Sequence, residues 1–212
     1  MSPRRPAVLR NDGGGQTLRD HLIATAARLI AERGTAGLTV RDIAREARVA
    51  DGVLYNHFKA KEELLAQALR AHVRAVMETA PPAPTAGEGE IAANLRAYTD
   101  SGLTVIARIL PAFAGLIGQP KVLALFHADG FPEGGGVFRT ALADYLRAEQ
   151  SLGRVSASAS PEAAATMIMG ACHELILPGL FQPGPYRAPV IPPGFTERVV
   201  TTVLHGIAPR ES

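Results

Sequence analysis

The sequence has one cysteine among its 212 residues and no long apolar run that is free of charge. The single cysteine, Cys172, excludes an intramolecular disulfide and is typical of a protein from a reducing compartment. The longest apolar stretch, residues 103–118, contains Arg108 and Pro111, so we expect no membrane span. Glycines follow the arginines near the amino terminus, where a signal peptide would have its apolar core. These absences predict a soluble, cytoplasmic protein with no membrane partner.

The net charge is small, but the charge is unevenly distributed along the chain. The formal total is +2, yet residues 1–78 hold 13 Lys and Arg against 9 Asp and Glu, whereas residues 79–212 hold 9 against 11. A basic amino-terminal third indicates an anionic partner such as nucleic acid. A difference of this size also arises by chance, so charge alone does not decide the function.

Alternating apolar runs, which would predict β-strands, are absent from the sequence, and we therefore expect an all-α fold. Residues 1–16 have no helical period and are expected to form a flexible tail. A cluster of prolines after residue 80 separates a predicted domain at residues 17–78 from a second helical domain at residues 88–208. Within the second domain, helices are predicted at residues 89–110, 111–127, 135–152, 161–177 and 195–208.

The densest local signals lie between residues 37 and 65. Thr39 is expected to begin a helix as its N-cap, and Asp42, three residues later, to complete a capping box. Leu38 and Ile43 are spaced to pack together across this cap as a hydrophobic staple. A helix that starts here and lasts about two turns needs support from neighbouring helices, because a helix so short is unstable alone.

A tight turn at residues 48–50 and a second short helix at residues 51–58 follow, and a third helix is expected to begin at Lys61. Two short helices joined by a tight turn are typical of a helix-turn-helix unit. The second helix of such a unit fits the major groove of DNA, which is about 12 Å wide.

Three stretches carry a family resemblance, namely LTVRDIA at residues 38–44, VADGVLYNHF at 49–58 and KEELL at 61–65. Over residues 18 to about 70 the sequence resembles the TetR family of bacterial transcriptional regulators. The resemblance implies an amino-terminal three-helix helix-turn-helix DNA-binding domain followed by a helical domain for ligand binding and dimerisation. It further implies a homodimeric repressor that binds a pseudo-palindromic operator in double-stranded DNA and is released by a small, largely apolar effector.

Residues expected to contact DNA lie on the two short helices and at the start of the third. Lys61 is expected to bind phosphate through its ammonium and the adjacent backbone N–H groups. Tyr55 is expected at a phosphate, and Arg41 at a phosphate or a base. The alternatives are a solvated Arg41, a Tyr55 ring packed between helices, and a structural hydrogen bond for His57. The predicted set is Arg41, Asp51, Gly52, Val53, Tyr55, Asn56, His57 and Lys61.

Within this set, Asp51, Gly52, Val53 and Asn56 are expected to face the base edges. The sequence departs from the family pattern at three positions in this region. Arg48 replaces a usual glycine in the turn, and a positive φ there would cost about 1 kcal/mol. Ala50 replaces a usual serine and removes a helix cap worth about 1 kcal/mol. Asp51 places an acid near the phosphates, although its carboxylate can also accept from cytosine N4.

The second domain is expected to hold the effector pocket and the dimer interface that the resemblance implies, although each candidate is also an ordinary core residue. The pocket candidates are Tyr98, Phe113, Phe126, Met167, His173 and Phe181. The interface candidates are Gly170, Ala171, Val200, Val203, Leu204 and Ile207, with packing inside one subunit as the alternative.

An enzyme is not expected. Cys172, His173 and Glu174 have the side chains of a nucleophile, a base and an orienting acid, but adjacent helical residues point about 100° apart and do not converge on one atom. We see no spacing for a metal site and no cofactor motif. The remaining alternatives are an effector-independent or architectural DNA-binding protein and, more distantly, an α-helical enzyme.

Overall fold

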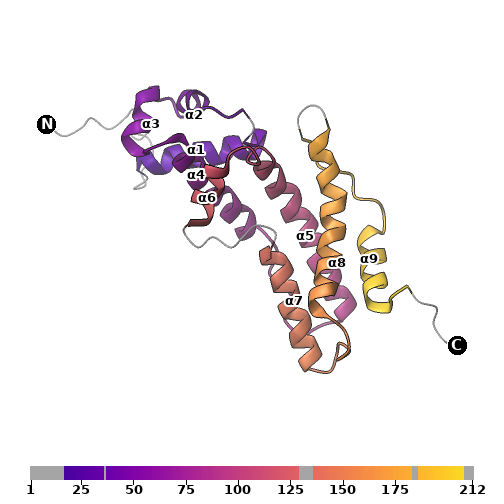
Figure 1. Cartoon of the computed structure of the whole chain (residues 1–212). Coiled ribbons are helices and arrows are strands. Elements are labelled where there is room, and N and C mark those ends of the chain that lie inside the picture. Colours follow the sequence, from indigo (N-terminus) through magenta and orange to yellow (C-terminus); the bar gives the residue numbers. More distant parts are fainter. Residues whose placement is uncertain (1–16, 36, 129–135, 183–185, 208–212) are drawn as a thin grey trace. The chain divides into compact units, whose positions relative to one another are not determined.

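The computed structural model describes residues 17–35, 37–128, 136–182 and 186–207 (Figure 1). These residues form helices and connecting segments with no β-strand among them, so the predicted all-α fold is confirmed. The chain divides into two compact units. The first contains Met1–Glu78 and Arg108–Phe131, and the second contains Thr79–Ala107 and Pro132–Ser212. The predicted flexible tail, residues 1–16, lies outside the described residues.

The first unit is built around a single apolar core. Its helices are α1 (Leu18–Arg33), α2 (Val40–Glu46), α3 (Asp51–His57), α4 (Lys61–Glu78), the last part of α5 (Ile91–Ala114) and α6 (Pro120–Ala128). Helix α4 packs along α1 on one side and α6 on another. Leu22, Leu65 and Phe126, from these three helices, are almost completely buried in the shared core. Burial on several sides explains why α4 is the central helix of this unit.

Local capping signals place the start of α2 where the sequence predicts it. The Asp42 N–H donates to Thr39 Oγ1 at 3.1 Å, and the Thr39 N–H donates to Asp42 Oδ2 at 3.0 Å, which completes the predicted capping box. The hydrogen bonds from Thr39 lower the pKa of the Asp42 carboxyl. Leu38 and Ile43 both lie in the core, as the staple requires.

Within the first unit, three polar contacts join the end of α5 and α6 to α4 and to the residue pair that follows α1. Thr35 Oγ1 donates to Ala112 O at 2.8 Å, and Arg70 Nε donates to Phe126 O at 3.1 Å. His72 Nε2 lies 3.0 Å from Arg108 O. Burial lowers the pKa of His72, so the ring is neutral near pH 7 and its Nε2–H donates to the carbonyl.

The predicted helix boundary between residues 110 and 111 is wrong, because α5 continues through Pro111 to Ala114. Proline normally ends or kinks a helix, since it lacks an N–H donor and clashes with the preceding turn. Here the last turn is held by burial of Ala112 and by the hydroxyl of Thr35 on the Ala112 carbonyl. Helix α6 consequently begins at Pro120 and is shorter than predicted.

The second unit contains the remainder of α5 with α7 (Gly136–Ser151), α8 (Pro161–Ile176), a 3-10 turn (Leu177–Phe181) and α9 (Phe195–His205). Helices α7 and α8 pack along each other over a core that includes Leu142, Ile168 and Val200. The predicted cap of α8 is confirmed, since Ser160 Oγ accepts from the Ala163 N–H at 3.2 Å and Pro161 occupies the first turn.

A buried carboxylate fixes the segment that leads into α5 in this unit. Glu149 on α7 has no exposed surface, and its Oε1 accepts from the Gly87 N–H at 3.2 Å. Its Oε2 lies 3.3 Å from Arg154 Nε. A buried charge needs such partners, because an unpaired one costs several kcal/mol, on the order of 3–5. The contact therefore holds the proline-rich segment near residue 87 against α7.

One segment of the described residues, Pro161–Phe181, is long and apolar enough to cross a membrane by length and composition alone, with a mean hydropathy of 1.4. It consists of α8 and the 3-10 turn, and it carries Glu162 and Glu174. Only 28% of it is buried inside the structure, so several of its apolar side chains are exposed. The core helix of a soluble protein meets the same criteria of length and composition.

The turn between α2 and α3 gives a prediction about stability. Arg48 has a φ of +56°, which no other described non-glycine residue shares in sign. Because a Cβ is unfavourable in this region, Arg48→Gly should raise the free energy of unfolding by about 1 kcal/mol, measured by urea denaturation. Arg48→Ala keeps the Cβ and should leave stability unchanged. Equal stabilisation by both variants would contradict this account, since the gain would then come from removing the charged side chain.

Candidate nucleic-acid interface

Helices α2 and α3 form the predicted helix-turn-helix. The Val49 N–H donates to Ala44 O at 3.0 Å and closes the turn between them. Leu54 and Phe58 are buried in the core and attach α3 to the unit through one side. The opposite side is open to solvent. Asp51, Gly52, Tyr55 and Asn56 are exposed there, and Val53 and His57 are partly exposed.

Helix α3 depends on its neighbours because it has no cap of its own. Ala50 occupies the N-cap position and makes no side-chain hydrogen bond, as its replacement of serine predicts. At the other end, the Arg19 guanidinium lies 4.6 Å from the centre of the Phe58 ring and pairs with Glu63 Oε1 at 2.9 Å. Glu63 Oε2 in turn accepts from the Lys59 N–H at 2.9 Å. These contacts fix the turn that leads from α3 into α4.

Sequence reasoning did not identify Arg19 or the role of Glu63. The two residues are 44 positions apart, so no local spacing connects them. Both side chains lie on helices, and each is compatible with an ordinary solvated charge until the packing of α1 against α4 is known.

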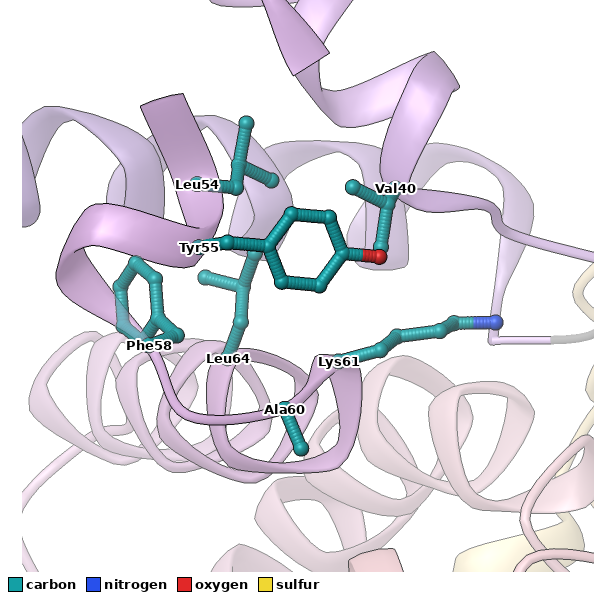
Figure 2. Close-up of a pocket in the computed structure, with 7 residues that line it drawn as sticks. All are labelled: Val40, Leu54, Tyr55, Phe58, Ala60, Lys61 and Leu64. Carbon is teal, nitrogen blue, oxygen red and sulfur yellow. The ribbon is translucent and has the colours of Figure 1, made fainter. Parts of the chain in front are cut away.

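Tyr55 and Lys61 extend toward the same side of the helix-turn-helix. Figure 2 shows the Tyr55 ring above the Lys61 side chain, with its hydroxyl directed to the side on which the ammonium lies. The ring borders a shallow surface pocket with a cavity volume of about 10 Å³. The pocket is lined by Val40, Leu54, Tyr55, Phe58, Ala60, Lys61 and Leu64. It is smaller than the roughly 300–1,000 Å³ of typical ligand sites, so it is not suited to an effector.

A charged contact joins α2 to the first residue of α3. Arg41 Nε lies 3.4 Å from Asp51 Oδ2, and the two side chains are 87% and 56% exposed. Further along α2, Arg45 pairs with Asp42 at 2.8 Å. Arg48 and Lys59 are also exposed in this part of the unit. The helix-turn-helix surface is therefore rich in cations, with one acid at the start of α3.

The six pocket candidates are divided between the two units. Phe113 and Phe126 pack edge to face in the core of the first unit, with ring centres 5.2 Å apart. The other four belong to the second unit. There, Tyr98 is buried, whereas Met167 and Phe181 are 55% and 76% exposed. These residues differ in their exposure to solvent. Aromatic or apolar character alone does not predict whether a residue is buried.

His173 is the remaining pocket candidate, and it lies beside the residues considered for catalysis. Its Nδ1 donates to Met169 O at 2.7 Å, one turn earlier on α8. Burial raises the pKa of the Cys172 thiol to about 12, so the thiolate form is disfavoured. Glu174 is exposed. The three side chains do not converge, and the described residues contain no group of three or more His, Cys, Asp or Glu that could hold a metal ion.

The interface candidates also differ in their surroundings. Val200 is 1% exposed and Val203 is partly buried, and both pack with the core of the second unit. Val200 thus serves packing within the chain, the alternative considered from the sequence. Gly170, Leu204 and Ile207 are exposed, and Ala171 is partly exposed.

Comparison with known proteins gives sequence matches over the helix-turn-helix. A model of the family described as bacterial regulatory proteins, tetR family, matches residues 22–68. The chain is 48% identical over 52 residues to the HTH-type transcriptional repressor KstR2 from Mycolicibacterium smegmatis. This match covers 24% of the chain and about a quarter of the relative, 25%.

Solved structures extend the likeness of fold to most of the chain. A TetR transcription regulator from Haloarcula marismortui has a TM-score of 0.57 at 18% identity, covering 88% of this chain and 94% of that one. The transcriptional regulator FadR from Bacillus subtilis, in complex with stearoyl-CoA, has a TM-score of 0.53 at 18% identity and covers 89% and 98%. The helix-turn-helix segment therefore matches the tetR family of bacterial regulatory proteins, and the solved structures share the fold of most of the chain.

Proposed function

We propose that this protein is a cytoplasmic, sequence-specific transcriptional repressor that binds DNA through α3. The observation that carries the proposal is the solvent-exposed side of α3. The side chains of Tyr55 and Lys61 extend in the same direction at its border. Lys61 begins an 18-residue helix whose first N–H groups add to the attraction of its ammonium for phosphate. The relative KstR2, matched over this segment, is named a transcriptional repressor.

Gly52 supports a role for α3 at the DNA. Its φ is not positive, and a Cβ at this position would meet nothing within 4 Å. Glycine within a helix costs about 0.5–1 kcal/mol relative to alanine, and neither the backbone nor the packing of this chain requires it here. A glycine at this position would instead allow α3 to approach a DNA surface closely, because it has no side chain. With Gly52, we assign Val53 and Asn56 to the base edges and His57 to the phosphates.

A homodimer fits this function, because two-fold symmetry places two copies of α3 about 34–36 Å apart on successive major grooves of a pseudo-palindrome. We propose α8 and α9 as its interface. Met167 and Phe181 on the α8 segment, and Leu204 and Ile207 at the end of α9, are exposed apolar side chains. At Gly170 a Cβ would meet nothing within 4 Å, which leaves room for a partner helix.

Release by a small, largely apolar effector is the regulatory part of the proposal. The ligand would bind in the second unit, with Tyr98 and His173 as candidate polar anchors, and would act on DNA binding through α4. The stearoyl-CoA complex of the FadR regulator from Bacillus subtilis supports an acyl ligand as the first probe. Effector-independent repression is the second candidate, favoured by the edge-to-face packing of Phe113 on the buried Phe126 ring, which gives these two candidates a role in the core of the first unit.

The phosphate contacts are tested by Lys61→Ala and Tyr55→Phe. Lys61→Ala should weaken binding to specific and non-specific duplexes alike and lower the slope of log K against log salt by about one, since one phosphate contact is lost. Tyr55→Phe should weaken binding roughly tenfold without changing the slope, because the lost hydroxyl is neutral. Lys121→Ala, at an exposed lysine of α6, is the control and should bind like the unsubstituted protein. Unchanged binding in the first two variants, with circular dichroism intact, would contradict the proposed DNA-facing surface.

Operator titrations with and without stearoyl-CoA test the effector. Because linkage is reciprocal, the acyl-CoA should weaken operator binding, and operator should weaken acyl-CoA binding by the same factor. Fluorescence anisotropy of a labelled operator measures the first effect, and calorimetry with saturating operator measures the second. Equal operator affinity at saturating acyl-CoA would exclude this ligand as the inducer and favour the effector-independent repressor.

A further inference from the structure

The ion pair between Arg41 and Asp51 is not explained by stability. It is the contact of 3.4 Å between Arg41 Nε and Asp51 Oδ2, and both side chains are largely exposed. Exposed ion pairs contribute about 0–1 kcal/mol, because solvent screens the charges and ordering two long side chains costs entropy. Core burial of Ile43 and Leu54 already holds α2 and α3 in the unit. The stability of the fold therefore does not explain the pair, and we look for its role in binding.

Asp51 also has a cost for a surface that meets DNA. It is the first residue of α3, and its carboxylate is exposed on the side proposed to face the groove. An unpaired acid there repels phosphates and weakens binding to every sequence. An acid that neutralises part of the Arg41 charge reduces the attraction of Arg41 for phosphates in general. Such a pair favours a contact that depends on geometry over one that depends on charge.

The geometry of the pair leaves the outer edge of the guanidinium available. Arg41 Nε is the guanidinium nitrogen that lies 3.4 Å from Asp51 Oδ2, and the Arg41 side chain is 87% exposed. A guanidinium is planar and rigid, so an acid beside its Nε favours orientations that direct the two terminal N–H groups on the opposite edge away from that acid. Two parallel donors of this kind match the O6 and N7 acceptors that guanine presents in the major groove.

We propose that Arg41 and Asp51 form one reading unit, in which Arg41 contacts a guanine and Asp51 is the positioning residue that aims it. The inference rests on the proposed DNA-binding function and adds the base that this pair selects. It predicts one G·C base pair in each operator half-site whose recognition depends on both residues. Asp51 acts through Arg41 rather than by touching the base itself.

The test compares Asp51→Asn and Arg41→Lys, in the full chain, on the operator selected by the unsubstituted protein from random duplexes. Affinity is measured for that operator and for versions with each base pair of a half-site replaced in turn. Arg41→Lys keeps the charge but loses the bidentate fork, so discrimination at one G·C pair should fall by about 5- to 150-fold. Asp51→Asn should lose discrimination at the same base pair, and the double variant should lose no more than Arg41→Lys alone.

Asp51→Asn has a second expected effect that a merely structural role would not produce. Removing the acid should strengthen binding to non-specific duplexes and steepen the salt slope by up to about one, because Arg41 is then free to reach a phosphate. Glu32→Gln is the matched control. Glu32 on α1 is 45% exposed and pairs with Arg28 at 2.8 Å, so this variant also removes an exposed acid from an arginine pair of the same unit. Its base discrimination and salt slope should be unchanged.

Three outcomes would overturn the inference. Full discrimination in Arg41→Lys would place Arg41 at a phosphate. Loss in Arg41→Lys but not in Asp51→Asn would show that Asp51 does not position Arg41. Loss at two different base pairs in the two variants would show that Asp51 reads a base, such as cytosine, by itself. Failure of the proposed function is distinct from all three, since the unsubstituted protein would then select no operator.

Discussion

Burial of Leu54 and Phe58 is the interaction on which the proposed DNA-facing surface depends. Helix α3 has seven residues and no side-chain cap at Ala50, so it has little stability of its own. The two buried side chains attach it to the core of the first unit. The Arg19 guanidinium lies over the Phe58 ring, 4.6 Å from its centre. Because one side of the helix is fixed in this way, Tyr55 and its exposed neighbours are presented outward in a defined orientation.

Features that depend on neighbours in the sequence could be predicted from it. The capping box of Thr39 and the cap at Ser160 each follow from a few adjacent residues, and each is present. Features that depend on tertiary packing could not. The pairing of Arg19 with Glu63 joins residues 44 positions apart, and α5 passes through Pro111 because the core supports its last turn. The candidates on the helix-turn-helix lie together because they share one motif. The effector candidates were chosen by residue type and are divided between the two units, with Met167 and Phe181 exposed.

Helix α5 has a distinct position in this account, since it contributes residues to both units. Its last part meets the first unit through backbone carbonyls, with Thr35 donating to Ala112 O and His72 donating to Arg108 O. His72 lies on α4, the same helix that begins at Lys61. Under the proposed function, an effector that changes α5 would act on the phosphate-binding end of α4 through one continuous helix. Regulation would then need no separate connecting element.

The most direct test of the central claim is selection of bound fragments from a pool of random duplex DNA, followed by sequencing. A repressor that presents two copies of α3 should enrich one pseudo-palindromic motif with half-sites about 34–36 Å, or one helical turn, apart. The protein should protect both half-sites equally in a footprint of that motif. Recovery of fragments without any shared motif, at all salt concentrations, would contradict the account and would indicate binding through charge alone.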